Sequence, residues 1–377
     1  MIKIAMITNE PAPYRIPTLN KIAETPGIQF HAVFCCEREP NRSWSLPPLR
    51  FGYTYLRERI STYKGRYIHN NVDVLPALGR FAPDVVVTTG FNPTHLYAFA
   101  YAVAKRAAHV SMTDGTFESE MSLSVLHRLV RRIVYARSQA FVWASLGGKK
   151  LYESYGIAET SSFRSCLCID NALFFQPPEE RIAPFDFIFC GRIEPVKNPL
   201  FALEVALEVA RRLKRVVKIL YVGSGADEEA LRRAAARHPN LVQVVLHGFA
   251  SQDELPALYR SARIFIFPTR WDPWGVVANE ACAAGLPVIV SPKAGVAGEL
   301  VIDGQNGFVC DLDVQLWAGR AVLLLTRPTL YLGFSNSSRA VVDRYTFDAA
   351  SEGILQACQF ASAQSPRQRG VSSAGRV

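Results

Sequence analysis

Asp272 and Glu280 lie eight residues apart, and both side chains are carboxylates that could serve one site. The apolar run 264–267 predicts a buried strand, and residues 276–284 predict the helix that follows it. Asp272 therefore falls in the loop between them, and Glu280 falls on the helix. Open α/β sheets bind their ligands at this carboxyl end of the strands. An ordinary strand–helix–strand unit with two solvated acids remains the alternative.

The start of that helix offers backbone groups to an anion. Gly275 leaves room for a ligand to approach, and the first N–H groups of a helix have no partner within it. The helix dipole favours negative charge at the same place. We therefore predict that Gly275, Val276 and Val277 contact a ligand through the main chain.

A strand predicted over 185–190 leads into a second segment with chemical potential, which contains Gly191, Arg192 and Lys197. A guanidinium binds phosphate oxygens in a bidentate way, and an ammonium adds a mobile point charge. Arg192 and Lys197 at a strand-to-helix turn therefore predict a diphosphate site. Two surface cations in a loop are the alternative.

Two further strands end in turns of the same kind. Residues 218–222 lead into Gly223 and Gly225, and residues 242–246 lead towards Phe249. A Gly-x-Gly turn occurs in many loops, so the interpretation depends on the order of these turns along the chain.

That order resembles the retaining glycosyltransferases of the GT-B fold, most of all glycosyltransferase family 4, and the resemblance is strongest over 185–310. Asp272 and Glu280 match the two acids of the family's E-x7-E signature. There the first acid contacts the transferred sugar and the second contacts the ribose. Asp272 stands where the family has glutamate, so its side chain is one methylene shorter. The resemblance implies that Arg192 and Lys197 grip the donor diphosphate.

The resemblance also implies the rest of the donor site. Gly191 belongs to the diphosphate motif, and Gly223 and Gly225 match the nucleotide-side turn. Backbone groups beside Phe249 are where the family holds the base. The nucleoside-diphosphate sugar is a co-substrate, so no cofactor is expected. No metal is expected either, because the two cations can stabilise the leaving diphosphate.

The first half of the chain alternates strands and helices, which predicts a mostly parallel sheet covered on both faces. The loop after its first strand carries Asn9, Tyr14 and Arg15, which we predict to face the acceptor or the donor phosphates. Helix capping is the alternative for Tyr14 and Arg15. The strands are predicted near residues 2–8, 30–35, 84–89, 109–112, 140–144 and 166–169.

Asp114 follows the fourth of these strands, and His95 lies near a helix start. At the position of Asp114 the family usually has a histidine that faces the reacting sugar and precedes a glycine. The carboxylate could hold an acceptor hydroxyl or act as its base. An Asp–Gly turn is the structural alternative. His95 is a further acceptor-side candidate, with a surface histidine as its alternative.

Residues 121–152 contain six basic side chains and no acid. On a helical wheel the apolar side chains of 123–133 fall on one side and the arginines on the other. A basic amphipathic helix can lie on an anionic membrane surface, whereas a core-facing helix with a solvated basic back is the alternative. The six are Arg128, Arg131, Arg132, Arg137, Lys149 and Lys150.

Composition narrows the class of protein. The 377 residues suffice for two domains, and 49% hydrophobic with 20% charged residues fit a soluble enzyme or one that touches a membrane. The chain has no apolar run of roughly 18 residues and begins directly with a strand, so we expect neither a spanning helix nor a signal peptide. The eight cysteines lack zinc spacing and are expected to be reduced thiols. The net charge of +9 comes without an aromatic–basic motif, so nucleic acid is not an expected partner.

We therefore predict the α/β class and a GT-B architecture of two Rossmann-like domains facing across a cleft. The boundary is placed where the period is lost and prolines accumulate, near residue 175. The predicted parts are an acceptor-side domain over 1–172, a nucleotide-sugar domain over 183–344, a helix over 345–362 that packs back on the first domain, and a disordered tail over 363–377.

The resemblance implies a metal-independent hexosyltransferase. It would move a sugar from a nucleoside-diphosphate sugar to a glycan or lipid-linked acceptor with retained anomeric configuration. Bacterial surface polysaccharide synthesis is the expected role, in the cytoplasm at the inner face of the membrane. Two alternatives remain open: a sugar-nucleotide 2-epimerase of the same fold, and a catalytically silent nucleotide-binding scaffold, which Asp272 and Asp114 would permit.

Overall fold

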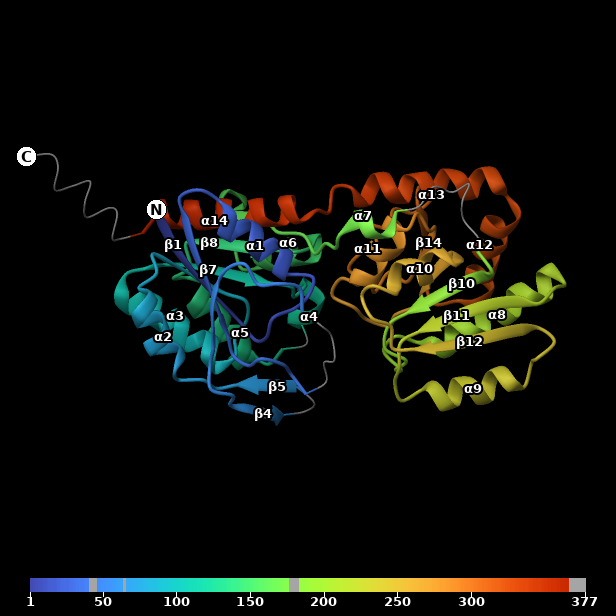
Figure 1. Ribbon diagram of the computed structural model, residues 1–377, viewed down its shortest axis with the longest axis horizontal. Coiled ribbons are helices and arrows are strands. Elements are labelled where there is room, and N and C mark those ends of the chain that lie inside the picture. The colour runs from blue at the N-terminus through green and yellow to red at the C-terminus, as the bar shows by residue number, and fades with distance from the viewer. Residues whose placement is uncertain (41–45, 64–65, 122, 176–182, 366–377) are drawn as a thin grey trace, which may run out of the picture. The chain divides into compact units, whose positions relative to one another are not determined.

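Strand β1 (Ile2–Thr8) lies inside the first of two parallel sheets in the computed structural model, which describes residues 1–40, 46–63, 66–121, 123–175 and 183–365 (Figure 1). Within these residues the sheet has the order β3-β2-β1-β6-β7-β8-β9, and every neighbouring pair is parallel. Its other strands are β2 (Ile28–Phe34), β3 (Gly52–Tyr55), β6 (Val85–Thr88), β7 (Ala108–Thr113), β8 (Ala140–Trp143) and β9 (Ser162–Arg164).

Helices cover both faces of this sheet. Alternate residues of a strand point to opposite faces, so the residues of β1 enter two separate cores. Ile4 and Met6 belong to a core shared with α1 and α14, whereas Ala5 and Ile7 belong to a core shared with α2 and α3. The helices on the two faces are α1 (Ile16–Glu24), α14 (Phe347–Ala363), α2 (Val74–Phe81) and α3 (Pro93–Lys105). The remaining elements here are α4 (Phe117–Met121), α5 (Val125–Tyr135), α6 (Leu146–Ser154), the 3-10 turn Glu159–Ser161, and the antiparallel pair β4 (Ile60–Tyr63) and β5 (Arg66–His69).

The second sheet has the order β12-β11-β10-β13-β14-β15 in the described part of the chain, again with parallel neighbours. One face buries Phe187, Ile219 and Tyr221 beneath helices α8 and α12. The strands are β10 (Phe185–Cys190), β11 (Val217–Val222), β12 (Val242–Gly248), β13 (Ala262–Phe267), β14 (Val288–Val290) and β15 (Gly307–Val309). The helices are α7 (Asn171–Phe174), α8 (Pro199–Leu213), α9 (Glu228–Ala236), α10 (Leu255–Arg260), α11 (Val276–Ala283), α12 (Val314–Thr326) and α13 (Pro328–Val342).

The chain divides into two compact units. The first comprises Met1–Leu167 and the segment that starts at Phe347, and the second comprises Cys168–Thr346. Helix α14 thus belongs to the first unit, where it packs against α1, β8 and β9. The predicted disordered tail falls mostly on residues 366–377, which lie outside the described residues. None of the described helices is both long and apolar enough to span a membrane.

Several strand assignments differ from the sequence prediction, among them β4 and β5, which were not predicted. Residues 166–169 are not a strand, although all four are buried, and the last strand of the first sheet lies earlier, at β9. Residues 166–169 are buried but do not pair with a neighbouring strand. A buried apolar run has the same sequence pattern whether or not it pairs in a sheet. Strands β3 and β15, at sheet edges, are not among the predicted strands.

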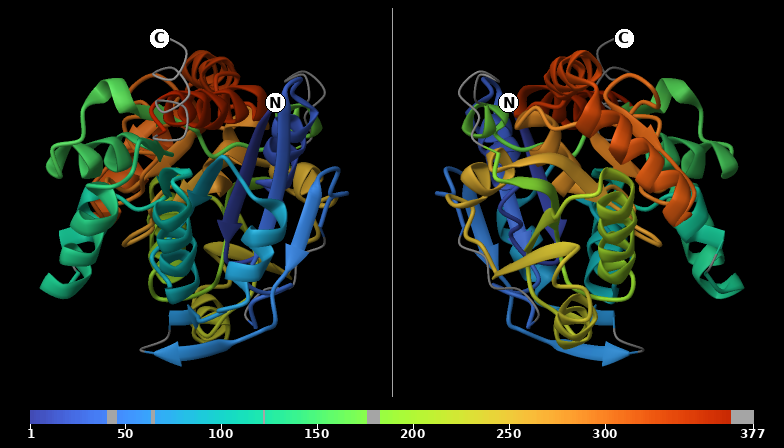
Figure 2. Two further views of the ribbon diagram at one scale, coloured as in Figure 1. Left: turned by 90° about the vertical axis from the view of Figure 1, so that its left-hand side faces the viewer. Right: turned by 90° about the vertical axis from the view of Figure 1, so that its right-hand side faces the viewer.

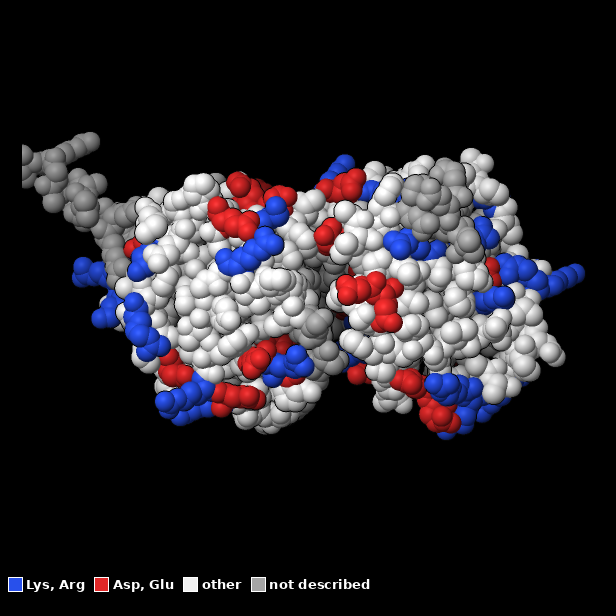
Figure 3. Space-filling model, in the orientation of Figure 1, with Lys and Arg blue, Asp and Glu red and all other residues white. Residues whose placement is uncertain are grey.

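Charged side chains of both signs are interspersed over the face seen in Figure 3. Lys and Arg there alternate with Asp and Glu on each unit rather than gathering into one basic stripe. On this face the net charge of +9 therefore does not produce the continuous footprint that nucleic acid requires.

Candidate functional site

Each sheet reverses its strand order at one place, between β1 and β6 in the first and between β10 and β13 in the second. Loops leaving the carboxyl ends of such neighbours diverge to opposite faces of the sheet and leave a crevice where ligands bind. The two switch points are therefore the places to look for the predicted site residues, first in the second unit and then in the first.

The loops after β10 and β13 are tied to each other at the switch point of the second unit. The Arg270 backbone N–H donates to the Val196 carbonyl at 2.8 Å, and the Thr269 hydroxyl donates to the same oxygen at 3.1 Å. These two hydrogen bonds to one carbonyl hold the loop that carries Arg192 and Lys197 against the loop that carries Asp272.

Lys197 and Asp272 come from separate motifs and form an ion pair. The Nζ and Oδ2 atoms lie 2.5 Å apart, and the two side chains are only 16% and 14% exposed. The other carboxylate oxygen, Oδ1, accepts the Trp274 backbone N–H at 3.1 Å. Asp272 is therefore held in one orientation, and the shielding of both charges from water strengthens their attraction.

Arg192 is not drawn into this pair. Its side chain is 56% exposed, and Nη1 lies 2.7 Å from a carboxylate oxygen of Glu194. The structure thus places one predicted cation beside Asp272 and leaves the other on the surface of the same loop, where a solvent-borne ligand can reach it.

Glycines allow the loops after β10 and β11 to pack closely. A Cβ at Gly223 would lie 2.1 Å from the Gly191 carbonyl oxygen, and a Cβ at Gly225 would lie 2.3 Å from the Ile193 carbonyl oxygen. Gly191 and Gly223 also have φ values of +140° and +127°, which favour glycine. Gly191, Gly223 and Gly225, three of the four glycines predicted for the donor site, therefore have a structural role in shaping this edge.

Replacing Gly225 by alanine is expected to destabilise the protein by about 1–3 kcal/mol, because the new methyl group must displace a backbone carbonyl. The measurement is the free energy of unfolding in urea. Gly79→Ala is the matched control: that glycine lies within α2 with open space around it, so the same change should stabilise by about 0.5–1 kcal/mol. Equal effects of the two substitutions would contradict the packing role.

Gly275 turns the chain from β13 into α11. Its φ is +100°, and a Cβ would lie 2.4 Å from the Phe267 ring, so no other residue fits without a shift. Val276 and Val277 open the helix and are half-buried. Their N–H groups belong to the first turn, which has no acceptors within the helix.

Glu280 is buried on α11, with 6% of the residue exposed. The Tyr259 hydroxyl of α10 donates to Oε2 at 2.7 Å. Burial raises the pKa of Glu280 to about 7, although the Tyr259 hydrogen bond opposes the shift. Sequence reasoning missed Tyr259, because a tyrosine within an ordinary short helix carries no signal of a partner 21 residues away.

Phe249 follows β12 directly after Gly248, and its ring is 59% exposed. The neighbouring loop is joined to the glycine turn, since the Gly223 N–H donates to the Gly248 carbonyl at 2.7 Å. An exposed aromatic side chain can stack on a planar ring.

At the switch point of the first unit, the structure brings Arg15 and Asp114 together. The Arg15 Nη2 atom contacts both Asp114 oxygens, with side-chain exposures of 17% and 39%. Arg15 lies in the loop after β1 and Asp114 follows β7, so two separately predicted residues share one place. Tyr14 lies next to them, with the Arg15 guanidinium 5.9 Å from the centre of its ring.

Asn9 and His95 form a second contact in this unit, but His95 is not at the surface. Only 1% of His95 is exposed, and its Nε2 lies 3.1 Å from Asn9 Oδ1. Burial lowers the pKa of His95 to about 3, so the ring stays neutral. The contact holds the Asn9 side chain in place, and the burial of His95 excludes the surface alternative.

Comparison with known proteins finds similarity mainly over the second unit. Residues 172–340 match the family described as Glycosyl transferases group 1. A glycogen synthase of Mycobacterium tuberculosis is 33% identical over 156 residues, which are 41% of this chain and 37% of that protein. A D-inositol 3-phosphate glycosyltransferase of Segniliparus rotundus is 29% identical over 188 residues, which are 48% of this chain and 40% of that protein.

The chain spans about two fifths of the length of these curated relatives. The crystal structure of Anabaena Alr3699/HepE in complex with UDP and glucose is similar with a TM-score of 0.71 at 14% identity. The match covers 95% of this chain and all of that one. This likeness confirms the predicted GT-B fold. Residues 172–340 are therefore similar to the Glycosyl transferases group 1 family, and the chain has the GT-B fold.

Proposed function

We propose that the chain is a retaining glycosyltransferase that moves a hexose from a nucleoside-diphosphate sugar to a glycan or lipid-linked acceptor. The observation that carries this proposal is the shielded Lys197–Asp272 pair at the switch point of the second unit. A cation and a carboxylate held together at a strand end suit a ligand that carries a diphosphate beside a sugar. The names of the two relatives support the same reaction class.

In this proposal each charged group acts on one part of the donor. Lys197 donates to Asp272 with one of its three N–H groups and keeps the others for phosphate oxygens. Together with Arg192 it neutralises the charge that grows on the leaving diphosphate as the sugar–oxygen bond breaks, so that no metal is required. Asp272 holds the transferred sugar, and Glu280 accepts hydrogen bonds from the ribose.

On the acceptor side we propose that Asp114 binds the attacking hydroxyl. Asp114→Asn is expected to lower transfer about 100-fold, as loss of a positioned base does, and to leave nucleotide affinity unchanged. Asp348→Asn is the matched control, because it also removes an aspartate from an ion pair of the first unit, with a side chain that is 79% exposed. Transfer rate and nucleotide affinity are measured for both. A parallel loss of both quantities in Asp114→Asn would contradict the assignment.

The decisive experiment incubates the purified chain with UDP-, GDP- and other nucleotide sugars, first alone and then with bacterial lipid extract. We expect nucleoside diphosphate to be released only with the extract, and not by Glu280→Ala. Sugar epimers formed without extract would instead establish a 2-epimerase. Tight binding of nucleotide without turnover across the panel would establish a silent scaffold.

We further propose surface polysaccharide synthesis in a bacterium, in the cytoplasm at the inner face of the membrane, as the setting. The support for the membrane part comes from the surface of α5.

A further inference from the structure

Helix α5 exposes one stripe of apolar side chains, while Val130, Val134 and Tyr135 pack against the core. The exposed fractions are 74% for Val125, 69% for Leu126, 51% for Leu129 and 56% for Ile133, and Met121 at the end of α4 is 61% exposed. A helix on the surface of a soluble unit normally buries such a stripe. Leu126, Leu129 and Ile133 therefore do not face the core, in contrast to the core-facing alternative, whereas Val130 from the same side of the wheel packs against it. Both views of Figure 2 show this blue-green helix at the periphery.

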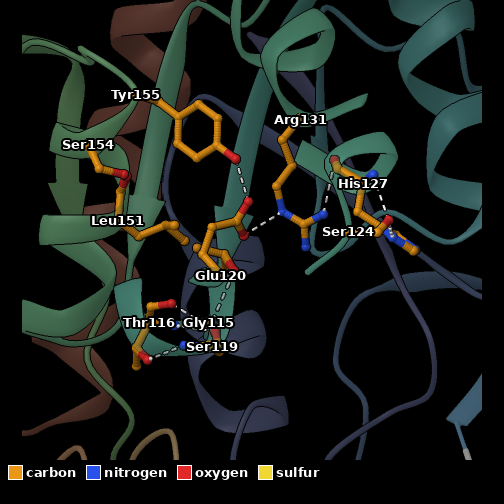
Figure 4. Close-up of polar contacts among 11 residues, drawn as sticks. Gly115, Thr116, Ser119, Glu120, Ser124, His127, Arg131, Leu151, Ser154 and Tyr155 are labelled. Atoms are coloured by element: carbon orange, nitrogen blue, oxygen red, sulfur yellow. Dashed lines mark hydrogen bonds and ion pairs between the residues drawn. The ribbon is translucent and has the colours of Figure 1, made fainter. Parts of the chain in front are cut away.

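A charged residue takes the place of the stripe on the inner side. Arg131 Nε lies 2.9 Å from Glu120 Oε2, and the two side chains are 16% and 6% exposed. The guanidinium also lies 4.2 Å from the centre of the Phe91 ring, and the Tyr155 hydroxyl donates to the other Glu120 oxygen (Figure 4). Arg131 therefore does not lie on a solvated back of the helix, as the core-facing alternative has it. The pair with Glu120 holds Arg131 on the inner side of α5, next to the buried Val134 and Tyr135.

An apolar groove runs beside the exposed stripe. A cavity of about 520 Å³ lies between α3 and α5, and Ile133 belongs both to its wall and to the stripe. The opposite wall comes from α3, where Val103 is 39% exposed. The lining residues are Phe99, Ala100, Val103, Ala104, Ile133, Ala136 and Arg137.

Basic side chains accompany both features. Arg132 and Arg137 are exposed, and Arg128 is partly exposed. In the described residues none of the three forms an ion pair within 4 Å, in contrast to Arg131. The sequence from 121 to 152 contains no acid that could compensate them. A second copy of the chain on this face would bring arginines against arginines in a twofold contact, whereas an anionic headgroup layer complements them.

We propose that α5 and the groove beside it dock the first unit on an anionic lipid bilayer. The helix lies in the headgroup region with Leu126 and Leu129 in the acyl boundary, and the groove takes part of one acyl chain. The docking surface stands on the geometry of α5 alone. Only its consequence, that the acceptor is lipid-linked, rests on the proposed function.

The test is flotation of the full chain with vesicles of phosphatidylcholine, with and without 30% phosphatidylglycerol. We expect at least tenfold tighter binding to the anionic vesicles, as two or more arginines at the surface would give. Leu126→Ser with Leu129→Ser should lower that binding at least tenfold, because both methyl-bearing side chains leave the boundary. Leu316→Ser with Leu332→Ser removes two exposed leucines of the second unit, 40% and 46% exposed, and should change binding less than twofold.

Two further variants separate the contribution of the arginines to vesicle binding from that of the groove. Arg128→Gln with Arg132→Gln should weaken binding about 25-fold, or fivefold for each arginine, and reduce its salt dependence. Ala104→Phe fills the groove without touching the arginines and should weaken binding at least threefold. Full binding by Ala104→Phe would overturn the acyl-chain part of the proposal.

Two results would overturn the docking surface itself. One is equal binding to neutral and anionic vesicles. The other is vesicle binding that survives the double leucine change while sedimentation shows a dimer becoming a monomer, which would make this face a contact between copies. Affinity for the panel of UDP-, GDP- and other nucleotide sugars is measured in parallel. Vesicle binding without binding of any of these donors would contradict the proposed function and leave the docking surface intact.

Discussion

Lys197→Met is expected to lower kcat/KM for the donor at least 100-fold, the effect of removing one preorganised group from developing negative charge. The variant also leaves Asp272 as an uncompensated carboxylate with 14% of its side chain exposed. Removing one partner of such a shielded pair costs about 3 kcal/mol of folding stability. Steady-state kinetics and urea unfolding of the same preparation measure the two effects.

A double variant separates chemistry from folding. Lys197→Met with Asp272→Asn removes both charges, so the stability should largely return while the activity stays low. Lys21→Met is the matched control, because it breaks a Lys–Asp pair of 2.6 Å whose side chains are 40% and 79% exposed. Its effect on both quantities should be small, as for other surface pairs. Recovery of activity in the double variant would show that Lys197 acts only on the fold.

Glu280→Gln is expected to raise stability and abolish most activity in the same molecule. The pKa of Glu280 is about 7 in the folded protein and about 4.5 when the chain is unfolded. A carboxyl with a raised folded pKa contributes its stability below the unfolded value, and that contribution is lost as the pH rises through 7. At pH 8 the ionised group therefore opposes folding by roughly 3 kcal/mol, which glutamine removes.

The same ionisation governs function in the opposite sense. A carboxylate accepts hydrogen bonds from a ribose better than a neutral acid does, so wild-type donor affinity should rise between pH 6 and 8. Melting temperatures and donor affinity across this range measure both trends. Glu204→Gln on α8, at an exposed position, should reproduce neither. If the glutamine variant is less stable than wild type at pH 8, the burial argument fails.

The order of motifs along the chain predicted much of the second unit. Apolar runs followed by loops with charged residues or glycines predicted β10, β11, β12, β13 and β14. The parallel pairing of β10 with β13 then brings Lys197 next to Asp272. Strand β15 was missed because its three residues, Gly307–Val309, begin with a glycine, whereas the equally short β14 is a run of branched apolar residues. Tyr259 was missed because a hydrogen bond between helices leaves no local pattern.

The first unit shows the limit of periodicity more sharply. The pattern of α5 correctly predicts an amphipathic helix, but period alone does not state which face is buried. In the structure Glu120, which precedes the helix, pairs with Arg131 on the inner side, next to the buried Val134 and Tyr135. In the same way, His95 is buried because α3 packs against the sheet. This tertiary contact cannot be inferred from the position of His95 in the sequence.

The return of α14 to the first unit has a consequence for synthesis. About 180 residues of the second unit are made between β9 and Phe347, so the ribosome completes another domain before the first one receives its last helix. At translation rates of about 5–20 residues per second this interval lasts roughly ten seconds or more. During that time Ile4 and Met6 lack the wall that Ile354 and Cys358 later supply. The nascent first unit thus passes through a long-lived stage with an open apolar face, the kind of surface that chaperones bind.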